Sequence, residues 1–281
     1  MASPSTPSAG MMATIFTISG SVLAVLALFI GLVWMFQERI AFQPPGPPFP
    51  TSSGSRQVSY LAEDRQPLLA FLVGDSSSAR GLLLCFHGNA DLAARGIDWA
   101  EQLVRMTGVP VMLAEYRGYM GLGGRPTYHS SQLDSEAAFI FARDSLHIPP
   151  EHITFYGHSL GSAIAAELAM KHRPAALILE SPFTSARAMG RIIGWHPVEL
   201  AWDAISRFHF DTVARVASLN APVSVTHGAR DRLIPSEMGK QIFAAAKIKG
   251  GLLIVPDAVH NDVAARGGAT YWRWMKSAME Q

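Results

Sequence analysis

His152–Ala163 reads HITFYGHSLGSA, and this stretch decides the fold of the chain. A short run of β-branched and aromatic residues meets Gly-x-Ser-x-Gly and passes at once into a helical pattern of small residues. This order predicts a strand, a tight turn and a helix, with Ser159 on the turn. Gly157 and Gly161 let the strand and the helix approach closely, because neither carries a side chain. Ser159 Oγ should then stand exposed above the sheet, over the positive end of the helix dipole. A plain glycine turn is the alternative.

The length and composition of the chain restrict the class of protein. At 281 residues it can hold one large α/β domain and a short extra segment. The net charge is +1, from 23 basic and 22 acidic residues, and no basic block is present, so nucleic acid is not an expected partner. The single cysteine, Cys85, lies in an apolar run, where we expect a buried and unreactive thiol. His and Cys do not cluster as metal ligands do, and neither a metal nor an organic cofactor is expected.

The N-terminal segment differs in composition from the rest of the chain. Residues 1–10 are rich in Ser, Pro and Ala and carry no charge, which predicts a disordered tail. Residues 11–36 are apolar and uncharged, and they exceed the about 20 residues that span a bilayer. We expect a retained single-pass membrane anchor; a cleaved signal peptide is the alternative, although the basic n-region and the A-x-A-like site that it prefers are not clear here. Arginines follow the span and none precedes it, which favours a cytoplasmic catalytic domain.

A proline-rich linker is predicted at residues 37–54. Its run Pro44–Pro50 is a stiff spacer that cannot pair in a sheet, and we expect it to hold the domain off the membrane. The folded domain is expected at residues 55–281. It should open with an antiparallel hairpin at 57–61 and 68–73.

After the hairpin, buried apolar runs alternate with helical stretches. This alternation predicts an α/β fold with a mostly parallel, eight-stranded sheet flanked by helices. The apolar runs lie at 81–86, 110–114, 153–156, 175–179, 222–225 and 252–255. The helical stretches lie near 91–106, 130–143, 162–171, 236–246 and 264–279.

Three chemically matched residues each follow one of the expected strands. Ligands of parallel sheets bind beyond the carboxyl ends of the strands, so Ser159, Asp231 and His260 should meet there. A nucleophilic serine needs a base to take its proton, and the base needs a carboxylate to fix its tautomer. The order Ser, Asp, His along the chain is the one expected for a nucleophile turn on such a sheet. We therefore predict Ser159 as nucleophile, His260 as base and Asp231 as acid.

The loop His87–Ala90 follows the first parallel strand, where the second donor of an oxyanion hole belongs. We assign the Asn89 N–H to this role, with the Leu160 N–H from the serine turn as its partner. The Ala90 N–H is the second choice. A simple strand-to-helix turn with a capping side chain is the alternative interpretation of the loop.

Other titratable residues compete for these roles. Glu180 follows the strand before that of Asp231 and is the alternative acid. His158 is next to Ser159, but neighbouring side chains on a tight turn diverge, so we expect it to be a packing residue. His87 and His227 lie near the strand ends and should shape the site.

Six motifs are spread along the domain: HGNA at 87–90, YRGY at 116–119, GHSLG at 157–161, ESPFTS at 180–185, GARD at 228–231 and HND at 260–262. Together they resemble the α/β-hydrolase superfamily. More narrowly, they resemble its membrane-anchored subgroup related to eukaryotic α/β-hydrolase-domain depalmitoylases and to bacterial single-pass serine hydrolases. The resemblance covers about residues 55–280 and includes the anchor before it. It implies the α/β-hydrolase fold, with the nucleophile at Ser159, the acid at Asp231 and the base at His260.

The chain departs from the family pattern in its tyrosine-arginine loop. The family usually has Asp-Tyr-Arg-Gly-Tyr-Gly, whereas this chain ends the loop with Met120. A large side chain thus replaces a small residue near the expected pocket, so substrate preferences of the family do not transfer. Members of the family insert a cap where this chain has residues 184–220, and we expect a short helical cap there. Its Trp195 and Trp202 are candidates, with Met120, to line an acyl pocket; packing within the cap is the alternative.

These predictions describe a membrane-anchored serine hydrolase that cleaves carboxylic esters or thioesters of acyl substrates through an acyl-enzyme. The expected partners are an acyl ester, with lipids among the candidates, and the membrane through the N-terminal helix. An amidase or aminopeptidase-like hydrolase with the same three residues is one alternative. A non-catalytic scaffold that keeps the fold is the other.

Overall fold

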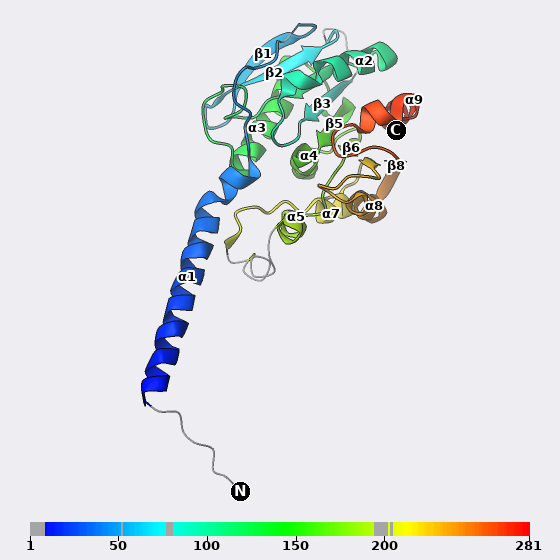
Figure 1. Cartoon of the computed structure of the whole chain (residues 1–281). Coiled ribbons are helices and arrows are strands. Elements are labelled where there is room, and N and C mark those ends of the chain that lie inside the picture. The colour runs from blue at the N-terminus through cyan, green and yellow to red at the C-terminus, as the bar shows by residue number, and fades with distance from the viewer. Residues whose placement is uncertain (1–8, 52, 77–80, 194–201, 203–204) are drawn as a thin grey trace.

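The computed structural model describes residues 9–51, 53–76, 81–193, 202 and 205–281. A long helix, α1, projects from a body in which helices cover both faces of a central sheet (Figure 1). The strands are β1 Arg56–Leu61, β2 Pro67–Val73, β3 Leu82–Phe86, β4 Val111–Ala114, β5 Ile153–His158, β6 Leu177–Glu180, β7 Pro222–Gly228 and β8 Ile248–Val255. The helices are α1 Ala9–Ala41, α2 Ile97–Thr107, α3 Tyr128–Ile140, α4 Leu160–Lys171, α5 Ala186–Ile193, α7 Thr212–Ser218, α8 Ser236–Ala245 and α9 Val263–Met279.

The described strands form one eight-stranded sheet in the order β1-β2-β4-β3-β5-β6-β7-β8. β2 pairs antiparallel with β1 and β4, and all other neighbours pair in parallel. The predicted opening hairpin and the mostly parallel eight-stranded α/β sheet are therefore confirmed. Because β3 and β5 to β8 run the same way, the loops that follow them meet at one edge of the sheet, which we call the carboxyl edge.

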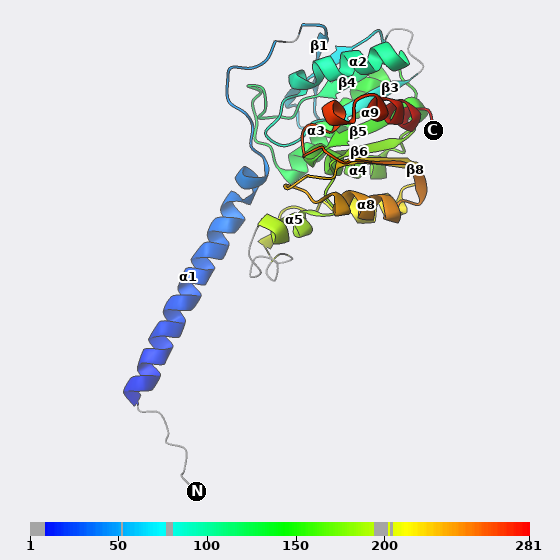
Figure 2. The ribbon, with the colours of Figure 1, turned by 45° about the vertical axis from the view of Figure 1, so that its right-hand side comes forward.

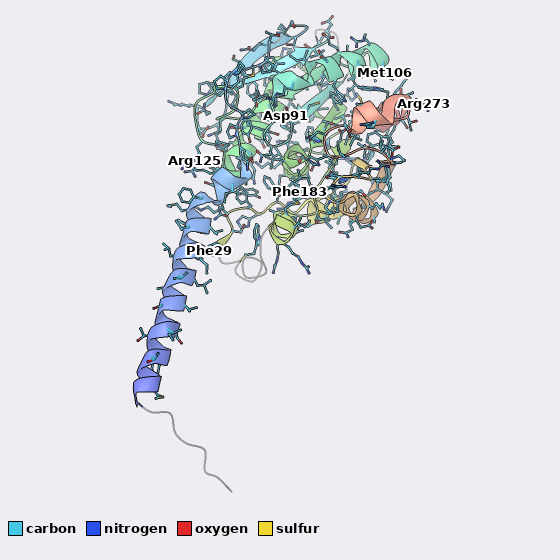
Figure 3. The ribbon with its side chains drawn as sticks, viewed as in Figure 1. Phe29, Asp91, Met106, Arg125, Phe183 and Arg273 are labelled. Carbon is cyan, nitrogen blue, oxygen red and sulfur yellow. The ribbon has the colours of Figure 1, made fainter. Side chains whose placement is uncertain are left out.

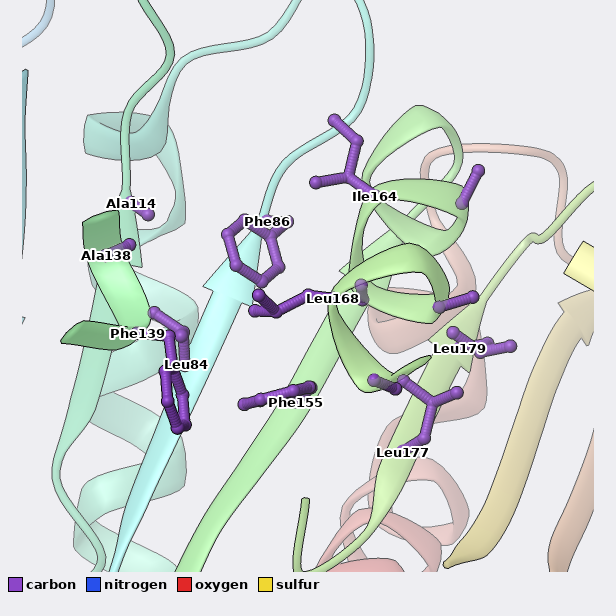
Figure 4. Close-up of a cluster of buried hydrophobic side chains, with 14 of the residues drawn as sticks. Leu84, Phe86, Ala114, Ala138, Phe139, Phe155, Ile164, Leu168, Leu177 and Leu179 are labelled. Atoms are coloured by element: carbon purple, nitrogen blue, oxygen red, sulfur yellow. The ribbon is translucent and has the colours of Figure 1, made fainter. Parts of the chain in front are cut away.

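The two faces of the sheet are covered by different helices. Along β3, Leu82, Leu84 and Phe86 join a core with α3, α4, α7 and α8, which we call the main core. Figure 4 shows part of it. Leu83 and Cys85 point to the opposite core, which α2 and α9 complete. This alternation is the period of two of a strand that is buried on both faces. Cys85 is only 4% exposed, as predicted.

The range predicted for the cap is divided in the structure. α5 lies at its beginning, and residues 194–201 and 203–204 are outside the described residues. α7 packs against α4 and α8, and its Val216 is buried in the main core. Hence the end of the range 184–220 is part of the body and is not an inserted cap.

α1 contains the segment predicted as an anchor. In the described part of the chain it is the helix that is long and apolar enough to cross a membrane, with its apolar stretch at Phe16–Ala41 and a mean hydropathy of 2.4. None of its most apolar 18-residue window is buried inside the structure. The tail predicted at residues 1–10 falls mostly on residues 1–8, which lie outside the described residues, and α1 begins at Ala9.

The segment predicted as a linker, residues 37–54, differs from that expectation. α1 continues to Ala41, and Phe42 is 3% exposed within the main core. Its ring lies 6.0 Å from that of Phe208, between centroids. Phe49, inside the proline run, also packs against the core. The chain therefore reaches the body before the prolines begin, and they do not separate the body from α1.

Candidate active site

Ser159 occupies a strained turn between β5 and α4, with φ 52° and ψ −115°. Such backbone angles are rare for a residue with a side chain. The two flanking glycines permit the turn: a Cβ on Gly157 would lie 2.2 Å from Gly161 O, and one on Gly161 would lie 2.0 Å from Phe86 O. The strand, turn and helix predicted around Ser159 are thus present.

The structure brings Ser159, His260 and Asp231 into one hydrogen-bonded chain. Ser159 Oγ lies 2.9 Å from His260 Nε2, and His260 Nδ1 lies 2.6 Å from Asp231 Oδ2. Ser159 follows β5, Asp231 follows β7 and His260 follows β8, so the carboxyl edge of the sheet assembles the group. With Nδ1–H donated to the carboxylate, Nε2 is free to accept the serine proton.

Asp231 is held as a carboxylate by four donors. Its Oδ1 accepts from the Leu233 and Ile234 amides, both at 2.9 Å, and its Oδ2 faces His260 and His227. Burial acts to raise the pKa of Asp231, but the hydrogen bonds from His227, His260 and Ile234 outweigh it and hold the pKa below its usual value. Asp231 is therefore ionised wherever a histidine titrates.

Glu180, the alternative acid, has other partners. Tyr271 Oη donates to Glu180 Oε2 at 2.7 Å, and Trp99 Nε1 donates to the same phenol at 3.0 Å. The main chain of Glu180 supports the turn, since its carbonyl accepts from the Ser159 amide at 2.9 Å. Glu180 thus braces α9 and the serine turn, while Asp231 holds the imidazole of His260.

His227 is a second histidine on Asp231. Its Nε2 lies 3.1 Å from Asp231 Oδ2 and 2.9 Å from Ile234 O, and the ring is fully buried. Both neighbours are acceptors, so Nε2 carries the hydrogen and donates. In the part of the chain that the structure describes, Nδ1 has no hydrogen-bond partner. It faces α8, where a Cβ on Gly239 would lie 2.6 Å away.

The backbone of His260 is fixed from two sides. Its carbonyl accepts from Ser181 Oγ at 3.1 Å and from His158 Nε2 at 3.2 Å. Burial lowers the pKa of His158, which keeps this ring neutral. His158 thus supports the loop that carries His260. Ser181 was not predicted as a site residue, although it directly follows a strand and belongs to the ESPFTS motif.

The loop His87–Ala90 is built around a buried ion pair. His87 Nε2 lies 2.7 Å from Glu115 Oε1, and Nδ1 lies 2.8 Å from Gly88 O. Two acceptors can both be satisfied only by the imidazolium form. Burial acts to lower the pKa of His87, but the charge of Glu115 and the two hydrogen bonds outweigh it and raise the pKa.

The side chain of Asn89 fastens the same loop. Its Oδ1 accepts from the Ala90 amide at 2.9 Å, from Tyr119 Oη at 2.9 Å and from the Gln43 amide at 2.8 Å. The loop lies directly on the serine turn: a Cβ on Gly88 would be 3.4 Å from Ser159 Cβ. The structure therefore places Asn89 beside the nucleophile turn.

Comparison with known proteins identifies the group to which the chain belongs. Residues 77–205 match a family model described as serine aminopeptidase, S33. An uncharacterized protein of Mycobacterium tuberculosis is 33% identical over 253 residues, which cover 86% of this chain and 88% of that protein. Alpha/beta hydrolase domain-containing protein 17B of Homo sapiens is 27% identical over 257 residues, 82% of this chain and 86% of that protein. The chain belongs to the α/β-hydrolase superfamily.

Solved structures share the fold of this α/β hydrolase. The Pyrococcus furiosus esterase Pf2001 superposes with a TM-score of 0.64 at 17% identity, covering 84% of this chain and 99% of that one. An α/β hydrolase from Vibrio vulnificus gives a TM-score of 0.65 at 18% identity, with 80% and 81% covered. The recognition of the superfamily from six sequence motifs is confirmed.

The residues predicted to line an acyl pocket of the hydrolase are less well placed. Met120 is half-buried against both cores and has φ 49°, a left-handed angle that suits the glycine expected there. Trp202 is half-buried, and a Cβ on Gly190 of α5 would lie 2.6 Å from its ring. Trp195 lies outside the described residues. Among the described residues, no group of three or more His, Cys, Asp or Glu side chains could hold a metal ion.

Proposed function

We propose that this chain is a membrane-anchored serine hydrolase that cleaves the ester bond of acyl substrates through an acyl-enzyme. The observation that carries the proposal is the chain of contacts from Ser159 Oγ through His260 to Asp231, at 2.9 and 2.6 Å. His260 Nε2 takes the serine proton as Oγ attacks the carbonyl carbon, and it returns the proton to the leaving alcohol. Water then attacks the acyl-enzyme, with His260 again as base.

The negative charge of the tetrahedral intermediate is assigned to two amides. Leu160 is the first residue of α4, so its N–H has no acceptor within the helix and points along the helix dipole. The Asn89 N–H comes from the loop that lies against Ser159. The imidazolium of His87, behind that loop, adds positive charge on the same side.

The strained backbone of Ser159 favours an enzyme over a scaffold. A φ of 52° costs about 1–3 kcal/mol and persists where the surrounding structure enforces it, as at nucleophile turns. A protein that only bound partners would gain nothing from a serine held in this way.

Ester cleavage is favoured over aminopeptidase activity, although the family model is described as serine aminopeptidase. An aminopeptidase holds the ammonium group of its substrate with a carboxylate. Among the described residues, Glu115 and Glu180 are buried carboxylates next to the serine turn and the loop His87–Ala90, and both are already bound, by His87 and Tyr271. The structural neighbour from Pyrococcus furiosus is named an esterase, which agrees with this choice. Thioesters need the same attack and the same oxyanion donors, so they are included as substrates.

The test uses the full chain in detergent and p-nitrophenyl esters from acetate to palmitate. Ser159→Ala should lower turnover by about 10⁶-fold, to the level of the assay blank, and should abolish labelling by a fluorophosphonate. Ser131→Ala removes a serine of α3 whose Oγ donates to Tyr128 O, away from the site, and it should keep both properties. Turnover or labelling that survives Ser159→Ala would refute the proposal. Aminoacyl p-nitroanilides, tested in parallel, should not be cleaved.

A further inference from the structure

The end of α1 is fastened to the body through its polar residues. Gln37 Nε2 donates to Ile205 O at 2.9 Å, and Gln37 Oε1 accepts from the Arg207 amide at 2.7 Å. Glu38 lies 3.7 Å from both Arg125 and Arg207. We call this set of contacts, with those of Phe42 and Gln43, the junction. One turn earlier, the guanidinium of Arg207 also lies over the Trp34 ring, 3.8 Å from its centroid.

The junction lies at the carboxyl edge of the sheet. The Gln43 amide donates to Asn89 Oδ1 at 2.8 Å, and Asn89 is the residue assigned to the oxyanion hole. Phe42 packs on Phe208 within the main core. The end of α1 is thus fixed both by the loop after β3 and by the segment before α7. Its direction relative to Ser159 is therefore set by more than one contact.

The distance between the apolar part of α1 and the body is short. Trp34 suits the interfacial level of a bilayer, and Glu38 is four residues further, which is about 6 Å along a helix. Nothing flexible lies between them, because the helix is continuous to Ala41. A bilayer around the apolar part of α1 would therefore touch the side of the body from which α1 leaves.

That side of the body carries exposed apolar side chains. α5 lies there in both Figure 1 and Figure 2, and its Ile192 is 46% exposed. Two more lie at the carboxyl edge: Leu233, two residues after Asp231, is 51% exposed, and Val259, just before His260, is 45% exposed. Single exposed apolar residues are common on protein surfaces, but Leu233 and Val259 adjoin Asp231 and His260, so an apolar partner that covered them would lie next to the site.

We propose that α1 is docked rigidly on the catalytic edge, so that the mouth of the site rests on the lipid bilayer and takes acyl chains directly from it. The bilayer is the partner that fits, since the same face joins the apolar helix and the exposed apolar side chains. The substrate class is then an acyl ester dissolved in the membrane. Both parts rest on the proposed function: the contact with the bilayer rests on its membrane anchor, and the choice of substrate rests on its ester hydrolysis.

Contact with the bilayer can be measured without any turnover. Ile192→Cys and, as matched control, Met106→Cys each provide one thiol for a nitrobenzoxadiazole probe, while Cys85 is buried and escapes labelling. Met106 is also exposed, but it lies on α2, on the far side of the body from α1 (Figure 3). In phosphatidylcholine nanodiscs with lipids spin-labelled near the headgroup, the probe at position 192 should lose most of its emission and that at 106 should keep it. Equal quenching of the two probes would overturn the proposal.

Rigid docking is tested by an insertion. A Gly/Ser segment of about twelve residues, with a reach of about 20 Å, is placed after Phe36, which frees the body from the span but leaves the junction intact. The matched control has the same insertion after Gly46, which is exposed and lies beyond the junction. The first insertion should abolish the quenching at position 192, and the control should not. Quenching that survives the first insertion would overturn rigid docking.

The same pair of insertions tests the substrate class. Wild type and control should hydrolyse p-nitrophenyl palmitate dissolved in the nanodisc, and the insertion after Phe36 should slow this by about tenfold or more, because a docked site meets membrane substrate at a high effective concentration. Hydrolysis of p-nitrophenyl acetate from water should not change. An unchanged palmitate-to-acetate ratio would overturn the membrane-substrate inference. If the wild type itself does not hydrolyse p-nitrophenyl acetate, this result would instead refute the proposed function.

Discussion

At the scale of single residues, Asp231 accepts hydrogen bonds from two imidazoles, although one imidazole is enough for a Ser-His-Asp triad. In the proposed mechanism, His260 accepts the serine proton through its other nitrogen, whereas His227 Nε2 bonds Asp231 Oδ2 and Ile234 O. His227 is therefore a positioning residue. It keeps Oδ2 aimed at His260 Nδ1 and stabilises the charge of the carboxylate.

His227→Phe should lower kcat/KM for p-nitrophenyl butyrate by about tenfold, the effect of about 1.4 kcal/mol that a lost hydrogen bond to a charged group produces. His227→Gln keeps an N–H donor and should retain most of the activity. If the Phe and Gln variants behave alike, His227 has only a packing role.

The ion pair of His87 and Glu115 predicts a pH dependence of stability. The pKa of His87 is raised in the folded state, so its contribution is complete below the unfolded value of about 6.5 and is lost as pH rises through the folded value. The Tm of the wild type in detergent should therefore fall as pH increases from about 6.5. Glu115→Gln removes the charge that raises the pKa and should flatten this dependence. Parallel Tm curves for the two proteins would contradict the assignment.

The reacting residues could be predicted from the sequence, but their supports could not. Ser159, Asp231 and His260 each follow an apolar run, and a parallel sheet must bring such positions together. The support of the His260 carbonyl by Ser181 depends on the left-handed turn of that serine, at φ 47°. The donor role of His227 depends on which way its ring faces. Tertiary packing sets both features, and a local sequence pattern does not reveal it.

At the scale of elements, the serine turn depends on how closely β5, α4 and β3 approach. Gly161→Ala would place a Cβ 2.0 Å from Phe86 O, and backbone cannot move aside as a flexible side chain can. We expect a loss of at least about 2–3 kcal/mol in the free energy of unfolding. Gly123→Ala is the matched control, since its Cβ would meet nothing closer than 3.8 Å, and it should change stability by less than about 0.5 kcal/mol. Thermal unfolding in detergent measures the stability of both variants. An equal loss of stability in the two would contradict the packing argument.

The strands and most of the helices were predictable because their patterns are local. The apolar runs that became β3 to β7 are continuous and bounded by turn residues, which is sufficient to predict buried strands. β8 starts at Ile248, before its predicted run at 252–255, and only Val255 in it is buried. The end of α1 was not predictable in this way. The apolar run stops at Phe36, and the helix continues to Ala41 with the help of contacts to residues such as Ile205, which are far away in the sequence.

At the scale of the whole molecule, Phe42 can be used to test whether the end of α1 folds as one unit with the body or is a separate part linked to it. Phe42→Ala removes a buried ring from the main core and should lower the free energy of unfolding by about 3 kcal/mol or more. Phe36→Ala, on the exposed side of α1 at 36% exposure, should have little effect on stability in detergent. Thermal unfolding of the full chain measures both. Similar Tm values for the two variants would mean that the body folds independently of the end of α1.

A continuous helix that ends inside the core also determines how such an enzyme can search for substrate. In the arrangement proposed above, span and body are locked together, so the site cannot swing away to sample the surrounding solution. Its motion becomes lateral diffusion in two dimensions, confined to the leaflet beneath it. One molecule in one vesicle would then consume the esters of its own leaflet and leave those of a neighbouring vesicle untouched.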